Sequence, residues 1–181
     1  MTDDKSIERA AQTVEKTHGK LDILVNNAGT AALDGHASLR EAMRYAFDTN
    51  AAGPAVVTET FVPLLKKSSE VARIINVSSA IGSIEKRQRS EWRDVGMVQY
   101  RASKAALNMV SACQWADHGP DVKVFAYCPG YTVSNLSKGG NTAENGARAT
   151  RDSVSPLVDV LEGKRDDEAG SFLHGEGQHP W

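Results

Sequence analysis

Short apolar runs alternate along the chain with longer segments whose apolar positions recur at helical spacing. Three runs predict buried strands, at residues 23–25, 74–77 and 122–128, and a last short strand is expected at 172–173. Helical spacing predicts the intervening helices, which lie before Gly19 and at residues 49–67, 98–118 and 145–161. Because each interval between strands is long enough for a crossover helix, the alternation predicts an α/β fold with a parallel sheet.

Cap residues mark two of the helix starts. Asp3 or Asp4 is expected to cap the first helix, and Gly19 to end it. Ser38 and Glu41 have the spacing of a capping box, so a further helix should begin there.

Each predicted strand ends in small, polar or glycine-rich residues. The three endings are Asn26-Asn27-Ala28-Gly29, Ser78-Ser79-Ala80 and Pro129-Gly130. In an open parallel sheet, ligands bind at the carboxyl ends of the strands. The endings therefore predict a ligand site at one edge of the sheet.

Tyr100 and Lys104 carry the most specific chemical signal in the chain. They are one helical turn apart, so both side chains project from the same helix face. An ammonium group beside a phenol lowers the pKa of the phenol and makes it a better proton donor, while Ser79 holds a carbonyl oxygen. The alternative is an accidental Tyr-x-x-x-Lys pattern on a surface helix.

The ordered set of these motifs resembles the short-chain dehydrogenase/reductase family. The set is Asn26-Asn27-Ala28-Gly29, then Ser78-Ser79, then Tyr100 with Lys104, and then Pro129-Gly130. The resemblance extends from about Thr2 to Trp181, and the ending, with Gly170-Ser171-Phe172-Leu173 and Trp181, is similar to the carbonyl-reductase-like branch. It implies a Rossmann-like, doubly wound parallel sheet in a three-layer sandwich.

The resemblance also implies roles for four catalytic residues. Tyr100 would be the general acid/base, and Lys104 would lower its pKa and bind the nicotinamide ribose. Ser79 would polarise the carbonyl group, and Asn50 would hold a water molecule that links the lysine to solvent. For Asn50 the alternative is an ordinary asparagine at a helix kink.

The implied reaction is hydride transfer between NADP(H) and a ketone, an aldehyde or the corresponding alcohol. NADP rests on the carbonyl-reductase-like resemblance alone, and NAD is not excluded. The residues expected at the cofactor are Asn27, Gly29, Tyr100, Lys104, Pro129, Gly130, Thr132 and Ser134. For Asn27 and Gly29 the alternative is a simple turn at the end of a strand.

The Gly-x-x-x-Gly-x-Gly turn that holds the cofactor pyrophosphate in this family has no counterpart in the sequence. We therefore expect residues 1–181 to form one partial domain, an N-terminally truncated version of the fold. The rival hypothesis is a catalytically silent binding or regulatory fragment that has lost the phosphate-binding turn.

The interval between Ser79 and Tyr100 is wider than in most members of the family. The additional residues, roughly 84–96, resemble the insertion of monomeric carbonyl reductases, which favours a monomer. Trp92 in this segment is a candidate for shaping the substrate entrance.

The composition and net charge of the chain limit its expected classes of binding partner and its expected cellular location. The net charge of −2 does not indicate nucleic-acid binding, no apolar stretch is long enough to span a membrane, and the acidic start is unlike a signal peptide. A cytoplasmic protein acting on a small molecule is expected.

Cys113 and Cys128 are expected to be reduced and buried. The histidines lack metal-ligand spacing, and surface positions are expected for three of them, His118, His174 and His179.

Overall fold

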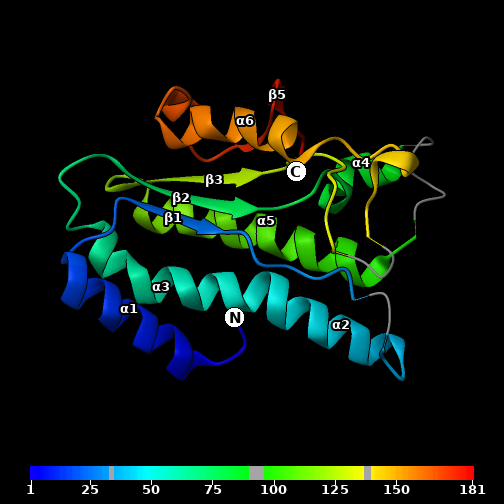
Figure 1. The fold of residues 1–181 in the computed structure, drawn as a ribbon, viewed down its shortest axis with the longest axis horizontal. Helices are drawn as coiled ribbons and strands as arrows, with labels where there is room; N and C mark the ends of the chain where they lie inside the picture. The colour runs from blue at the N-terminus through cyan, green and yellow to red at the C-terminus, as the bar shows by residue number, and fades with distance from the viewer. Residues whose placement is uncertain (33–34, 90–95, 137–139) are drawn as a thin grey trace.

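The computed structural model describes residues 1–32, 35–89, 96–136 and 140–181, and a five-stranded sheet forms its centre (Figure 1). The strands follow one another across the sheet in chain order: β1 (Ile23–Asn26), β2 (Ala72–Val77), β3 (Val122–Tyr127), β4 (Phe172–His174) and β5 (Gly177–Gln178). Strands β1 to β4 pair in parallel, and β5 returns antiparallel to β4 as a hairpin. The predicted α/β fold with a mostly parallel sheet is confirmed.

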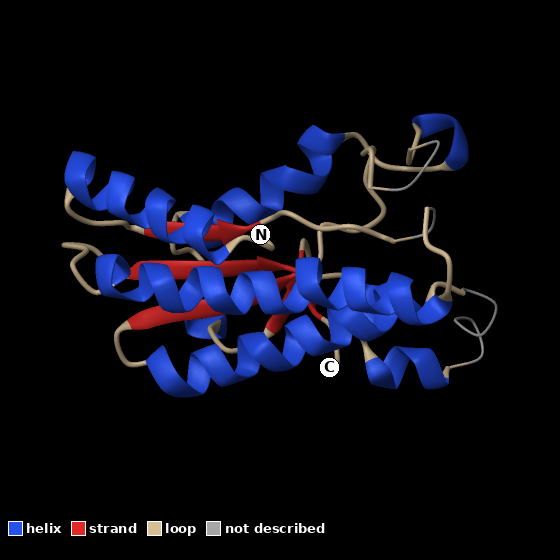
Figure 2. Cartoon of the chain, turned by 90° about the horizontal axis from the view of Figure 1, so that it is seen from below, coloured by secondary structure: helices blue, strands red, loops and turns tan. Residues whose placement is uncertain are grey.

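Helices cover both faces of the sheet. One face carries α1 (Asp4–His18), α3 (Gly53–Leu65) and α5 (Val98–His118), and the other carries α6 (Thr150–Leu161) (Figure 1). Figure 2 shows the first of these helical layers in front of the strands. Two further helices are α2 (Leu39–Phe47), which packs against α5, and the short α4 (Ile84–Gln88). This is the three-layer, doubly wound arrangement that the sequence predicts.

Successive residues of the central strands point to opposite faces and build two cores. Ile74 and Val124 pack with residues of α3 and with Trp115 of α5. Ile75 and Phe125, the next residues along the same strands, pack on the other face against α6. Because both faces are covered, these strands carry consecutive apolar residues, such as Ile74-Ile75 and Val124-Phe125, rather than alternating apolar and polar ones.

The predicted helix caps are confirmed. The Asp3 carboxylate accepts a hydrogen bond from the Ser6 N–H at 3.2 Å, and Gly19 ends α1 in the left-handed conformation with φ of 74°. The Ser38 hydroxyl likewise accepts from the Glu41 N–H at the start of α2, but the Glu41 carboxylate accepts from the Ala37 N–H and not from Ser38, so only half of the predicted capping box forms.

The helix predicted at residues 49–67 is two elements. A π-helical turn, Asp48–Ala52, joins α2 to α3. Pro54 has no N–H and cannot donate to the carbonyl of Asn50 in the α-helical pattern, and the Gly53 N–H bonds the Asp48 carbonyl five residues back. The wide turn places Asn50 inside the molecule, where it is completely buried.

The last predicted helix begins later than expected. Residues Ala143–Asn145 form only a 3₁₀ turn, and α6 begins at Thr150 rather than at 145. Gly146, with φ of 87°, and the extended Ala149 separate the two segments. The apolar spacing alone predicts one continuous helix, but the backbone conformations of these two residues interrupt it.

The two cysteines differ in environment, and both are free thiols. Cys128 is buried as expected, but the prediction for Cys113 is wrong, because it occupies an exposed position of α5 while Ser111 and Gln114 take the buried positions. In the described part of the chain, no helix combines the length and the apolar character that crossing a membrane requires.

Candidate active site

Ser79 and Tyr100 meet beyond the carboxyl end of β2. Ser79 precedes a 3₁₀ turn, Ala80–Gly82, that follows the strand, and Tyr100 lies in the first turn of α5. The Ser79 hydroxyl lies near enough to the Tyr100 phenol to lower its pKa, and both residues line one cavity. The phenol is therefore held beside a second polar group, although only 7% of the Tyr100 surface is exposed.

Lys104 lies one turn after Tyr100 on the same face of α5. Its Nζ is 5.8 Å from the centre of the Tyr100 ring and donates a hydrogen bond to the Val77 carbonyl at 2.7 Å. Gly82 packs directly on this turn, since a Cβ at that position would lie 2.8 Å from the Cβ of Lys104. The end of β2 and the following turn thus fix the position of the lysine.

The protonation of this pair differs from the expectation that Lys104 lowers the pKa of Tyr100. Burial raises the pKa of Tyr100 to about 12, and the neighbouring Ser79 hydroxyl opposes this rise only in part. Burial also lowers the pKa of Lys104 to about 8. The expectation is wrong for this structure because burial raises the pKa of Tyr100, and the group that opposes this rise is Ser79 and not Lys104.

Asn50 connects three segments behind the lysine. Its amide oxygen accepts from the Thr30 N–H at 2.8 Å, and its Nδ2 donates to the Thr30 carbonyl at 2.8 Å and to the Ser103 hydroxyl at 2.9 Å. A Cβ on Gly29 would lie 3.2 Å from the Asn50 oxygen and 3.5 Å from the Lys104 Nζ. Gly29, Asn50 and Lys104 are therefore neighbours, as their predicted roles require.

The remaining predicted cofactor residues are spread around this centre. Pro129 and Gly130 line the same cavity as Ser79 and Tyr100. The Thr132 hydroxyl binds Ser153 at the start of α6 at 2.8 Å, and Ser134 pairs with Asn141 in an isolated bridge. Asn27 is exposed directly after β1, where its N–H donates to the Val25 carbonyl.

A cavity of about 660 Å³ opens onto Ser79 and Tyr100. Lys86 of α4 and the histidines His174 and His179 also line it. The expected surface positions of these two histidines are wrong, because the β4–β5 hairpin turns them toward the cavity. His118 is also partly buried, with its Nε2 3.3 Å from a Glu59 carboxylate oxygen.

Three residues were not identified from the sequence: His174 and His179, which line the cavity, and Asn108 of α5, which supports the site. The Ser78 hydroxyl donates to the Asn108 side chain at 2.5 Å, one turn beyond Lys104. The spacing 100, 104, 108 on one helix face is a signal that could have found Asn108. Trp92 lies outside the described residues, as does much of the 84–96 segment. No cluster of potential metal ligands occurs within the described ranges.

Comparisons with known proteins agree with this geometry. The family model described as short chain dehydrogenase matches residues 1–145. The chain is 40% identical over 157 residues to the short-chain dehydrogenase anuI of Penicillium roqueforti, and the match covers 80% of this chain and 61% of that protein. It is 31% identical over 194 residues to the short-chain dehydrogenase/reductase tropE of Talaromyces stipitatus, covering 98% of this chain and 73% of the relative. The chain thus spans about three fifths of the first relative and about three quarters of the second.

Solved structures are similar over nearly the whole chain. The NADPH-bound carbonyl reductase from chicken fatty liver superposes with a TM-score of 0.85 at 31% identity, over 99% of this chain and 74% of the other. A short-chain dehydrogenase/reductase from Burkholderia multivorans with bound NADP gives a TM-score of 0.78 at 30% identity, again over 99% and 74%.

Proposed function

The chain belongs to the short-chain dehydrogenase family, and from this premise we propose that it reduces a ketone or aldehyde with NADPH, or oxidises the corresponding alcohol with NADP⁺. The observation that carries the proposal is the placement of Ser79 and the buried Tyr100 phenol on the wall of one cavity, with the Lys104 Nζ 5.8 Å from the Tyr100 ring. A carbonyl oxygen bound there meets two hydroxyl groups at once.

In this proposal, Tyr100 is the proton donor. With a pKa of about 12 its phenol is protonated at neutral pH, which suits protonation of a carbonyl oxygen as negative charge develops on it. Ser79 donates a second hydrogen bond to that oxygen and stabilises the same charge. Lys104, which is bonded to the Val77 carbonyl, and Asn50, which is bonded to Thr30, support the part of the site that contains Tyr100.

The nicotinamide cofactor supplies the hydride when it is bound. The residues present fit its nicotinamide and ribose portion: Gly29 leaves open a space beside Lys104 that any side chain would fill, and the Pro129–Gly130 turn borders the cavity. Both solved structures compared above are described with the phosphorylated cofactor, which supports NADP over NAD.

Oxidation of NADPH by a panel of ketones and aldehydes tests the proposal. We expect turnover by the parent chain, a fall of kcat/KM by about 10²–10⁴-fold in Tyr100→Phe, and a smaller loss in Ser79→Ala. Equal activity in the parent and Tyr100→Phe removes the proposed proton donor. A parent chain that neither binds NADPH nor oxidises it supports the binding or regulatory alternative instead.

A further inference from the structure

One part of the cavity wall is not used by the proposed reaction. It consists of Lys86 on α4 and of His174 and His179 on the β4–β5 hairpin. The Lys86 Nζ lies 2.7 Å from the His179 Nδ1. The two imidazole rings stack, with centres 4.3 Å apart and planes inclined by 21°.

The contact with Lys86 determines where His179 carries its proton. An ammonium group only donates hydrogen bonds, so the His179 Nδ1 must accept, and the neutral ring then carries its N–H at Nε2. Burial, followed by the charge of Lys86, lowers the pKa of His179 to about 4, so the ring is neutral at physiological pH. Among the residues that the structure describes, none hydrogen-bonds this Nε2.

His174 is fixed in the same tautomer by a different partner. Its Nδ1 accepts a hydrogen bond from the Glu176 backbone N–H at 3.3 Å, which also leaves the proton on Nε2. Burial lowers the pKa of His174, with Lys86 and Arg165 contributing. Both rings are therefore hydrogen-bond donors at Nε2 at neutral pH, beside a cationic lysine.

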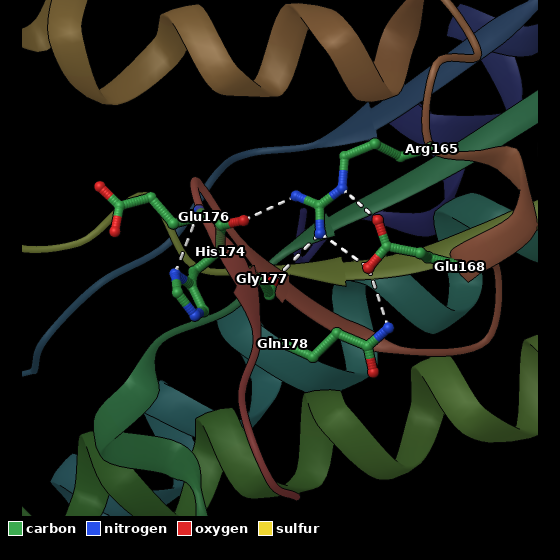
Figure 3. Close-up of polar contacts among 6 residues, drawn as sticks. All are labelled: Arg165, Glu168, His174, Glu176, Gly177 and Gln178. Carbon is green, nitrogen blue, oxygen red and sulfur yellow. Dashed lines mark hydrogen bonds and ion pairs between the residues drawn. The ribbon is translucent and has the colours of Figure 1, made fainter.

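The hairpin that carries these rings is held from behind (Figure 3). The Arg165 guanidinium donates to the His174 carbonyl at 2.7 Å and to the Gly177 carbonyl at 3.1 Å. The same group is paired with the Glu168 carboxylate, which also accepts from Gln178. The position of the donors is thus set before any ligand binds, which reduces the entropy lost on binding.

We propose that His179 and Lys86 form a recognition site for an anionic, acceptor-rich group, most simply a carboxylate, on the carbonyl substrate. A wall of N–H donors beside a positive charge complements an ionised oxygen and does not complement an apolar group. Two other charged residues that the structure describes line the cavity, the cationic Arg148 and the exposed, acidic Glu176. This inference rests on the proposed function for the reacting carbonyl, but the recognition itself is measurable without turnover.

Two ketones that differ only in the proposed group test the inference. Isothermal titration calorimetry with 4-acetylbenzoate and 4-methylacetophenone is carried out in the presence of NADP⁺, so that no reduction occurs, and repeated without it. We expect the parent chain to bind the carboxylate ketone about tenfold more tightly in at least one series. His179→Phe, which keeps an aromatic ring but no donor, should abolish the preference, and Lys86→Gln should reduce it.

Two control variants separate recognition from folding. His179→Gln retains an N–H donor and should retain most of the preference, whereas His18→Phe, on the far helix α1, should change neither affinity. Equal binding of both ketones by the parent in both series, or an unchanged preference in His179→Phe, overturns the inference. If the preference is present but the parent oxidises no NADPH with any ketone, the anion site stands and the proposed reaction fails.

Discussion

Tyr100 and Lys104 lie on one face of α5, and both side chains are almost completely buried. Because burial favours the neutral form of each, the phenol keeps its proton and the ammonium group loses its proton more readily than usual. At neutral pH the phenol therefore carries the proton that carbonyl reduction requires, and its raised pKa makes it a weaker acid than an exposed tyrosine.

Replacement of Tyr100 and replacement of Lys104 should have different effects on kcat and on the affinity for NADPH. Tyr100→Phe removes only the transferable proton, so we expect a large loss of kcat with nearly unchanged affinity for NADPH. Lys104→Ala should weaken both, because the lysine is also expected to contact the cofactor ribose. Steady-state kinetics and fluorescence titration with NADPH distinguish the two, and an identical pattern in both variants contradicts the assigned roles.

The burial of Lys104 should also be visible in stability. The unfolded lysine keeps its proton up to about pH 10.5 and the folded one only to about pH 8, so the unfolded state holds more protons between these values and the parent gains stability as the pH rises. Lys104→Met should raise the free energy of unfolding by up to about 3 kcal/mol below pH 8. This advantage should vanish near pH 10.5.

Urea denaturation at pH 7 and pH 10 measures this difference. Lys66→Met serves as the control, because it removes a lysine whose side chain is 44% exposed. A destabilised Lys104→Met at pH 7 means that the hydrogen bond to Val77 outweighs the burial of the charge.

The site residues that can be predicted from the sequence are recognised by their relation to nearby residues in the chain. Tyr100 and Lys104 are related by helical spacing, and Ser79 comes two residues after the end of strand β2 at Val77. His179 has no such relation, since it lies 93 positions from Lys86, and only the hairpin brings the two together. The tyrosine pKa is likewise a property of the surroundings in the fold, not of the neighbouring residue in the sequence.

At the scale of elements, the contact between the 3₁₀ turn Ala80–Gly82 and α5 determines where α5 lies relative to the end of β2. A Cβ on Gly82 would lie 2.9 Å from the Lys104 carbonyl carbon and 3.0 Å from the Ala105 nitrogen, so the helix must shift. We expect Gly82→Ala to destabilise the chain by about 1–3 kcal/mol and to lower activity.

Gly96→Ala is the matched control for this change, because no atom of the described residues outside its chain neighbours lies within 4 Å of a Cβ built there. Thermal unfolding and NADPH oxidation of both variants are compared. If Gly82→Ala and Gly96→Ala behave alike, the turn does not position α5.

Element boundaries were predicted best where side chains cap a helix and worst where the backbone departs from regular geometry. Asp3, Gly19 and Ser38 act through local hydrogen bonds and conformations that can be recognised from the sequence. The π-helical turn around Asn50 and the late start of α6 follow from Pro54 and from the backbone conformations of Gly146 and Ala149, and apolar spacing carries no trace of either.

At the scale of the whole molecule, β1 forms one edge of the described sheet. It pairs with β2 on one side, and the Val25 side chain is 39% exposed. An edge of this kind offers unpaired backbone groups to other chains, so we expect the chain to self-associate at high concentration. Val25→Lys should reduce the association, as measured by light scattering after size-exclusion chromatography. A parent chain that stays monomeric at all concentrations contradicts this expectation.

The hydrogen bonds of Asn50 have a consequence for how the site forms during folding. They join Thr30, 20 positions away, and Ser103, 53 positions away, so they are made only after long loops have closed. The helices around them form from local contacts and need no such closure. During refolding from denaturant, helical circular dichroism should therefore return before ligand binding does, and the site should be among the last parts of the molecule to become competent.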